Sequence, residues 1–149
     1  MDDPKLSIKN LIKDNWDAGN VSDVTPVIHC GWFDTKASTP QITITDTSEV
    51  VEAGGVSGYT GMTSSGTPAQ LWVGSASVNC WVTREAVSVN PKQLLFEMRE
   101  ELKRIIQANY DEISDLHFIA WKGGMELVDT AQSPVVYRWV GEVGYAYLD

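Results

Sequence analysis

Residues 90–110 read NPKQLLFEMREELKRIIQANY and form the most clearly helical stretch of the chain. Asn90 is a good N-cap, because its side-chain oxygen can accept a hydrogen bond from a first-turn amide. Pro91 then occupies the first helical position, where its missing N–H is not needed. Apolar residues recur at helical spacing, namely Leu95, Met98, Leu102, Ile105 and Ile106. The spacing predicts a helix over 91–110 whose apolar stripe packs on the core and carries no chemistry.

The opposite face of this helix is charged and is expected to face solvent. It carries Glu97, Arg99, Glu100, Lys103 and Arg104. Glu100 and Arg104 are ordered for a weak i,i+4 ion pair. Gln93 sits where the side chain of a capping box would reach back to the first residue.

A second, shorter helix is predicted over residues 4–16. Pro4 suits a first helical turn. The apolar residues that share one face at helical spacing are Ile8, Leu11, Ile12 and Trp16. Gly19 follows at a position that suits a left-handed cap.

Sequence of β type lies on both sides of the long helix. Strands are expected at 26–32, 41–45, 70–85, 116–121 and 135–148, with 49–52 extending or pairing with the second of them. Glycines are expected to interrupt the strands: Gly74 breaks the third, Gly123-Gly124 turns the chain after the fourth, and Gly141 with Gly144 marks a bulge or bend in the last. The order of elements predicts one α+β domain over 1–149, with a mostly antiparallel sheet packed against both helices.

Residues 54–68 are rich in Gly, Ser and Thr and differ in character from the flanking strands. A Gly-rich loop suggests phosphate binding, but no Gly-Lys-Ser/Thr follows it and no strand-to-helix context surrounds it. We therefore predict a long flexible loop at 54–68 that acts as an arm and becomes ordered against a neighbouring subunit.

The composition limits the classes of function. A net charge of −9 argues against a surface that grips nucleic-acid phosphates, since such binding needs clustered Lys and Arg. It is compatible with a protein that lets DNA pass without binding it. No apolar run is long enough to span a bilayer, and the acidic, polar N-terminus does not read as a secretory signal. We expect folding in a cytoplasm, where Cys30 and Cys80 stay reduced as buried free thiols.

Titratable residues do not form a recognisable catalytic pattern. The only cluster of candidates is His29, Cys30, Cys80 and His117, and their spacing lacks the close pairs that structural zinc favours. No nucleophile elbow, metalloprotease helix motif or dinucleotide fingerprint occurs. We predict no enzyme, no catalytic residue, no cofactor and no metal. An enzyme or metalloprotein that uses these four residues remains the third alternative.

Large aromatic residues are abundant, with six tryptophans in 149 residues. They lie on both faces of the predicted strands, so a single-layer sheet would expose some of them. Exposed Trp and Tyr are typical anchors of protein interfaces. The candidate interface residues are Tyr59, Met62, Trp72, Trp81, Trp121, Tyr137, Trp139 and Tyr145.

The layout of the whole chain resembles the tail-terminator or tail-completion proteins of tailed phages and related archaeal viruses. A short amphipathic helix leads to an extended strand at 40–44, followed by a Gly/Ser/Thr loop and a long strand through 78–82. The long helix comes next, and two strands close the chain. The segment with the strongest local resemblance is Pro-Val-Val-Tyr-Arg-Trp at 134–139.

The resemblance implies a structural virion protein without catalysis or cofactor. Such a subunit forms a ring, usually a hexamer, that joins the tail tube to the neck and capsid. Its partners would be further copies of itself, the tail-tube protein and neck or head-completion proteins, with DNA passing through the lumen without specific binding. It would be assembled in the host cytoplasm and located in the virion. The alternative is a small α+β binding or accessory domain that forms a homo-oligomer through its sheet.

Overall fold

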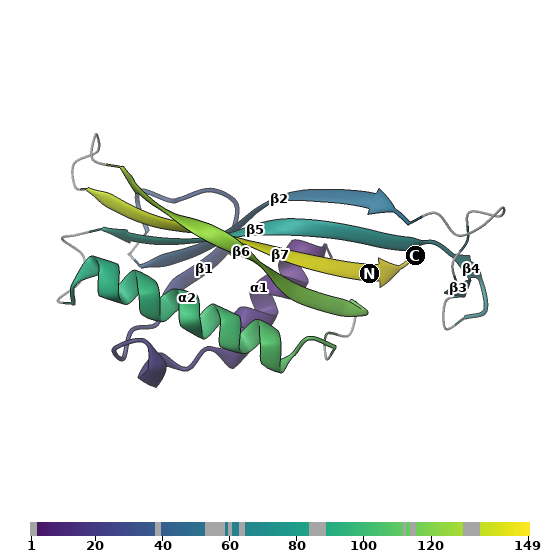
Figure 1. The fold of residues 1–149 in the computed structure, drawn as a ribbon, viewed down its shortest axis with the longest axis horizontal. Helices are drawn as coiled ribbons and strands as arrows, with labels where there is room; N and C mark the ends of the chain where they lie inside the picture. Colours follow the sequence, from purple (N-terminus) through teal and green to yellow (C-terminus); the bar gives the residue numbers. More distant parts are fainter. Residues whose placement is uncertain are drawn as a thin grey trace.

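Two helices cover one face of a five-stranded sheet in the computed structural model (Figure 1). The structure describes residues 3–37, 40–52, 59, 61–62, 65–83, 89–111, 113, 116–129 and 135–149. In chain order the elements are α1 (Pro4–Asn15), the 3-10 turn η1 (Ala18–Asn20), β1 (Val27–Cys30), β2 (Gln41–Val51), β3 (Gly61–Met62), β4 (Pro68–Ala69), β5 (Leu71–Thr83), α2 (Pro91–Ala108), β6 (Phe118–Asp129) and β7 (Val136–Leu148).

The sheet runs in the order β1-β2-β5-β7-β6. Only β1 and β2 are parallel, and every other neighbouring pair is antiparallel. The two central strands pair along their whole length, from Leu71 opposite Leu148 to Thr83 opposite Val136. The predicted α+β class with a mostly antiparallel sheet is therefore confirmed. A separate two-stranded hairpin, β3 with β4, lies at one end of the sheet (Figure 1).

Several glycines expected to end or bend strands instead lie inside continuous strands. Gly123-Gly124 does not turn the chain, because β6 continues to Asp129 and absorbs a bulge between Trp121 and Gly123. Gly123 has a φ of +116°, which favours glycine. A Cβ on Gly124 would lie 2.2 Å from the carbonyl oxygen of Val140, so the close approach of β7 requires glycine there.

The prediction of a break at Gly74 is also wrong. Strand β5 runs unbroken through Gly74, where a Cβ would meet the ring of Tyr145 at 2.6 Å. Gly141 and Gly144 keep a regular register with β5, whereas the bulge of β6 lies opposite the two residues between them, as the predicted bulge or bend requires. A Cβ on Gly141 would lie 2.5 Å from the Trp139 ring, so this glycine makes room for aromatic packing.

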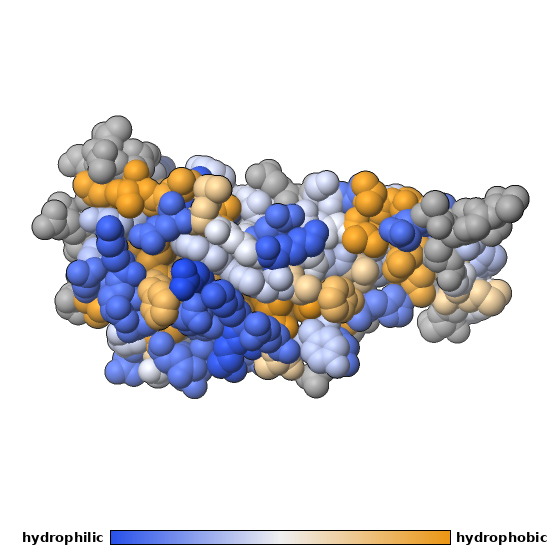
Figure 2. All heavy atoms as spheres, viewed as in Figure 1, coloured by the Kyte–Doolittle hydropathy of each residue, from blue (hydrophilic) through white to orange (hydrophobic). Residues whose placement is uncertain are grey.

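Helix α2 begins as the sequence predicts and ends at Ala108, two residues before the predicted end. The Asn90 side chain accepts hydrogen bonds from the amides of Lys92 (3.0 Å) and Gln93 (3.4 Å). The Gln93 side chain donates forward to Glu97 (3.2 Å) instead of reaching back. The outward face of α2 is hydrophilic (Figure 2).

The hydrophobic core lies between the two helices and the helix-facing side of the sheet. Residues of even number from β5, and from β2 before its bulge after Thr45, meet residues of odd number from β7 on this side, as the antiparallel register requires. The buried cluster includes Ile8, Ile12, Ile42, Ile44, Val78, Cys80, Val82, Leu94, Met98, Leu102, Ile105, Trp139, Val143 and Tyr145.

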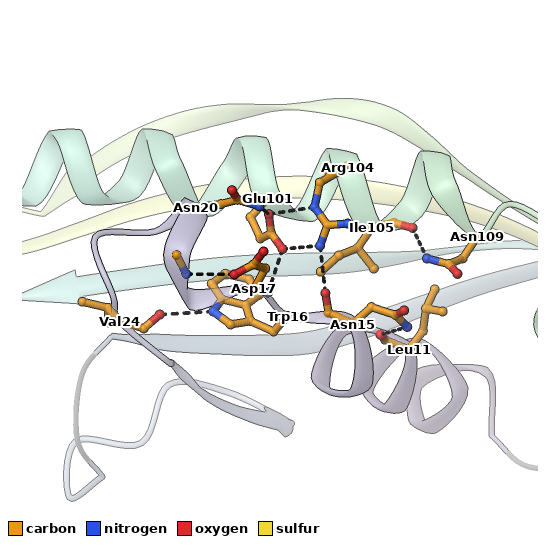
Figure 3. A network of polar contacts seen from close by, with 11 residues as sticks. Leu11, Asn15, Trp16, Asp17, Asn20, Val24, Glu101, Arg104, Ile105 and Asn109 are labelled. Carbon is orange, nitrogen blue, oxygen red and sulfur yellow. Dashed lines mark hydrogen bonds and ion pairs between the residues drawn. The ribbon is translucent and has the colours of Figure 1, made fainter.

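A buried carboxylate on α2 connects the two helices (Figure 3). Glu101 is 2% exposed and accepts hydrogen bonds from the Asp17 amide (2.9 Å), the Asn20 side chain (2.9 Å) and the Arg104 guanidinium. Arg104 also donates to the carbonyl oxygen of Asn15, the last residue of α1 (2.8 Å). The predicted pair of Glu100 with Arg104 is therefore not formed, and Glu100 instead pairs with Lys103 and Arg99.

The N-terminal turn and the central loop also differ from expectation. Gly19 lies inside η1, and the left-handed conformations fall on Ser22 (φ 48°) and Asp23 (φ 58°). Much of the flexible loop predicted at 54–68 lies outside the described residues. The described part of that range contains β3 and the start of β4, where Gly61 pairs with Ala69 and Met62 with Pro68.

Candidate interaction surface

The sheet face turned away from the helices is polar at its centre. Its central residues are small hydroxyl and amide side chains, including Thr43, Thr45, Ser48, Ser75, Ser77 and Asn79. They line or border a shallow trough of about 640 Å³ that extends to β6 and β7. The expectation of apolar side chains across both faces is therefore wrong for the middle of this face, and hydrophobic surface gathers at its two ends (Figure 2).

An aromatic cluster around one arginine occupies the end of this face where β7 begins. The guanidinium of Arg138 lies between two indoles, 4.6 Å from the Trp32 ring centroid and 4.5 Å from that of Trp81. Phe33 packs on Trp81 with ring centroids 5.0 Å apart. The Asn79 side-chain oxygen accepts from Arg138 Nη2 (2.8 Å) and Nε (3.3 Å), which fixes the guanidinium between the rings.

The connection between the parallel strands β1 and β2 brings two of these aromatics onto the sheet. It leaves β1 through Gly31, whose φ of +126° favours glycine. The buried side chain of Gln41 then holds the connection, donating to the carbonyl oxygen of Asp34 (2.7 Å) and accepting from its amide (3.1 Å). Trp32 remains 56% exposed, so the cluster presents an aromatic surface to solvent.

A pocket of about 340 Å³ opens beside this cluster. Its lining residues are Trp32, Phe33, Trp81, Leu127, Val128, Val136 and Arg138. They come from the β1–β2 connection and from the adjoining ends of β5, β6 and β7. The described lining is therefore mostly apolar and aromatic and includes one charged side chain, that of Arg138, which is the usual character of a binding pocket.

The outer half of strand β6 forms an exposed sheet edge next to the pocket. Its start is covered, because the Tyr110 carbonyl oxygen accepts from the Ile119 amide (2.9 Å). Beyond the bulge the side chains on both faces are exposed, including Met125 (61%), Leu127 (41%) and Val128 (43%). A long apolar edge strand of this kind is a ready site for pairing with another chain.

The opposite end of the sheet carries a second group of exposed apolar side chains. They are Val50, Val51, Tyr59 and Met62, and the last is 63% exposed. Beneath them, the Glu49 carboxylate accepts from the hydroxyls of Tyr145 (2.6 Å) and Tyr147 (3.1 Å), which joins β2 to β7 across β5. Burial and the Glu49 hydrogen bond raise the pKa of Tyr147 to about 12 and raise that of Tyr145 further.

The predicted interface residues divide into two groups. Tyr59 and Met62 are exposed at the hairpin end. Trp81, Trp139 and Tyr145 are buried by their own chain, whereas Trp72, Trp121 and Tyr137 are partly buried. Trp72 stacks on Tyr147, Trp121 stacks on Trp139, and Tyr137 packs against the core. Sequence reasoning omitted Trp32, Met125, Leu127 and Val128 from the candidates. The strand predicted at 116–121 ended before the last three of them, and exposure at a sheet edge depends on strand order, which local periodicity does not give.

The four residues of the enzyme alternative do not converge. His29 and Cys30 are neighbours in β1 and so point to opposite faces of the sheet. His29 Nε2 lies 3.2 Å from the side-chain oxygen of Gln41. Cys80 is a buried thiol whose pKa is raised by burial, whereas Cys30 is exposed, which corrects its predicted burial. Within the described residues, no group of three or more His, Cys, Asp or Glu is placed to hold a metal ion.

Comparison with protein-family models and with curated proteins finds no match to this chain. Among the described residues, no helix combines the length and the apolar character needed to cross a bilayer.

Proposed function

We propose that this chain is a self-assembling structural subunit whose contacts are made by the two ends of its sheet. More specifically, we propose a ring-forming tail-terminator or tail-completion protein that joins a viral tail tube to the neck and capsid. Self-assembly is supported by the exposed apolar groups at opposite ends of the sheet. The tail-terminator assignment rests on the resemblance in sequence layout.

The observation that carries the proposal is the position of the exposed apolar side chains. Trp32, Met125 and Leu127 lie at one end of the sheet, and Val50 and Met62 lie at the other, all between 41% and 63% exposed. Clustered exposed hydrophobic side chains mark interaction sites more often than scattered ones do. Two such clusters on one chain allow each copy to contact two neighbours, as a ring requires.

The net negative charge of the chain supports a role in surrounding DNA without binding it. A ring of subunits with a net charge of −9 each repels phosphates, so a genome could slide through its lumen without adhering. The partners in this proposal are other copies of the chain, the tail-tube protein and neck or head-completion proteins.

Sedimentation and electron microscopy test the proposal. The purified protein, alone and mixed with a tail-tube protein of the same virus, should form rings that sediment as a multiple of the 16.4 kDa chain. Disruption by high salt should be weak, because the contacts are mainly apolar. A protein that stays monomeric at all concentrations, with tube protein present, would count decisively against the proposal.

The alternative is a homo-oligomeric binding or accessory domain built on a continuous sheet. The exposed outer half of β6, with Met125 and Leu127, is the feature that favours it. Two copies related by a two-fold axis would pair these edges and stop at a dimer. The same sedimentation experiment separates the two proposals, because the alternative predicts a dimer that does not bind the tail-tube protein.

A further inference from the structure

Two features at opposite ends of the sheet fit each other as a protrusion and a hollow. The hollow is the aromatic pocket beside Arg138, at the end where β7 begins. The protrusion is the β3–β4 hairpin, at the end where β7 finishes (Figure 1). The register of the central strands separates them by nearly the full length of the sheet, since Trp81 is opposite Arg138 and Leu71 is opposite Leu148.

We propose that successive copies of this chain pack head to tail, with Met62 of one copy seated in the aromatic pocket of the next. This inference rests on the proposed self-assembly and specifies the contact that produces it. A heterologous contact of this kind leaves a free protrusion and a free pocket on every growing assembly, so it closes into a ring or continues as a filament.

The described part of the hairpin is joined to the end of β7 by packing and by backbone hydrogen bonds. Gly61 packs against Leu148, because a Cβ there would lie 3.4 Å from that side chain. Ala69 in β4 is fully buried, and the adjoining Gln70 exchanges two backbone hydrogen bonds with Asp149 (2.9 and 3.1 Å). The hairpin is thus tied to the end of β7, while Met62 projects with 63% of its surface exposed.

The chemistry of the pocket suits a methionine side chain. Methionine is flexible enough to fill an irregular hollow, and its sulfur makes favourable contacts with aromatic rings. The pocket offers the rings of Trp32, Phe33 and Trp81 in a volume of about 340 Å³, at the low end of the range for ligand pockets. This volume is large enough to admit a methionine side chain.

The charges at the two ends are also complementary. Among the described residues that line the pocket, Arg138 is the one that carries a charge. At the hairpin end, Glu52 follows β2 and Asp149 follows β7, and both are exposed. Carboxylates that approach the pocket rim together with Met62 would meet a cation, which favours the head-to-tail orientation over a contact between like ends.

Cysteine crosslinking tests this contact directly. In a Cys30→Ser background, which removes the exposed native thiol, one protein carries Met62→Cys and a second carries Leu127→Cys. We expect a disulfide-linked dimer when the two are mixed under mild oxidation, and a ladder of multimers when both substitutions are in one chain. Phe96→Cys, on the exposed face of α2, is the matched control and should not crosslink to either position.

The outcomes separate this inference from the proposed function. Oligomers that sediment normally but give no link between positions 62 and 127 would overturn the head-to-tail contact and leave self-assembly standing. Efficient linkage of Leu127→Cys to itself would likewise overturn it in favour of paired β6 edges. A strictly monomeric protein, with tube protein present, would overturn both proposals.

A second variant tests the contact without cysteine chemistry. Met62→Asp should weaken self-association at least about tenfold, as loss of a central interface anchor does, while subunit melting stays unchanged because the residue is exposed. Unchanged association of a folded Met62→Asp protein would refute the inference.

Discussion

Replacement of Glu101 by alanine should destabilise the subunit by about 3 kcal/mol. The carboxylate is 2% exposed and accepts hydrogen bonds from the Asp17 amide and the Asn20 side chain, which its removal would abolish. A hydrogen bond to a charged group contributes about 1.5–3 kcal/mol. The lower value applies to these two bonds, because Asp17 and Asn20 are exposed residues whose donors regain water. The Arg104 side chain is 45% exposed and recovers hydration, so its loss adds less.

Urea unfolding followed by tryptophan fluorescence measures this difference, with a constant m-value as the check that only stability has changed. Glu101→Gln keeps the shape and one acceptor oxygen, so it should lose about half as much free energy of unfolding. Glu100→Ala is the matched control, because Glu100 is 45% exposed on the same helix and its ion pairs are worth about 1 kcal/mol or less. If Glu101→Ala were no less stable than Glu100→Ala, the network would not join the helices as described.

The same carboxylate gives a defined dependence on pH. Burial alone would raise the pKa of Glu101, but hydrogen bonds from Arg104, Asp17 and Asn20 outweigh burial and hold it below its ordinary value. A lowered pKa in the folded state adds stability above the ordinary pKa, and that stability is lost as pH falls through the lowered value. The difference in unfolding free energy between wild type and Glu101→Gln should therefore shrink in acid. A difference that stayed constant with pH would contradict this reasoning.

Three further outcomes follow from buried groups elsewhere in the fold. Leu102→Ala should lower the free energy of unfolding by about 2–5 kcal/mol, since Leu102 is fully buried in the core. A smaller loss, measured by urea unfolding, would show that α2 is not a central part of the core. In an ultraviolet titration Tyr147 should ionise near pH 12, and Glu49→Gln should lower the pKa of Tyr147. The raised pKa contributes to the stability of the folded state below the ordinary pKa of tyrosine, and this contribution is lost as the pH rises through about 12. A thiol reagent should modify Cys30 but reach Cys80 only after unfolding, because Cys80 is buried and its pKa is raised; two reactive thiols in the native protein would contradict the burial of Cys80.

The sequence alone was sufficient for the helices and the fold class. The cap at Asn90, the proline after it and the apolar stripe through Leu102 are local signals, and local signals act within one or two helical turns. The alternating strands were found for the same reason, because the period of two is set by the pleat itself. The continuity of β6 through Gly123-Gly124 was missed, since the reason for those glycines is the close approach of β7.

The tertiary structure decided which side chains are on the surface. Glu101 lies in a charged run, and only the packing of α1 and η1 against α2 makes it a buried acceptor. Aromatic residues that suggested an interface, such as Trp139 and Tyr145, are buried by their own chain. The pocket beside Arg138 is lined by residues of the loop after β1 and of the ends of three strands. It could not be predicted from the sequence, because local periodicity does not show which distant segments lie next to one another. The sequence therefore determined the elements, and long-range packing determined which of their faces is left to meet another molecule.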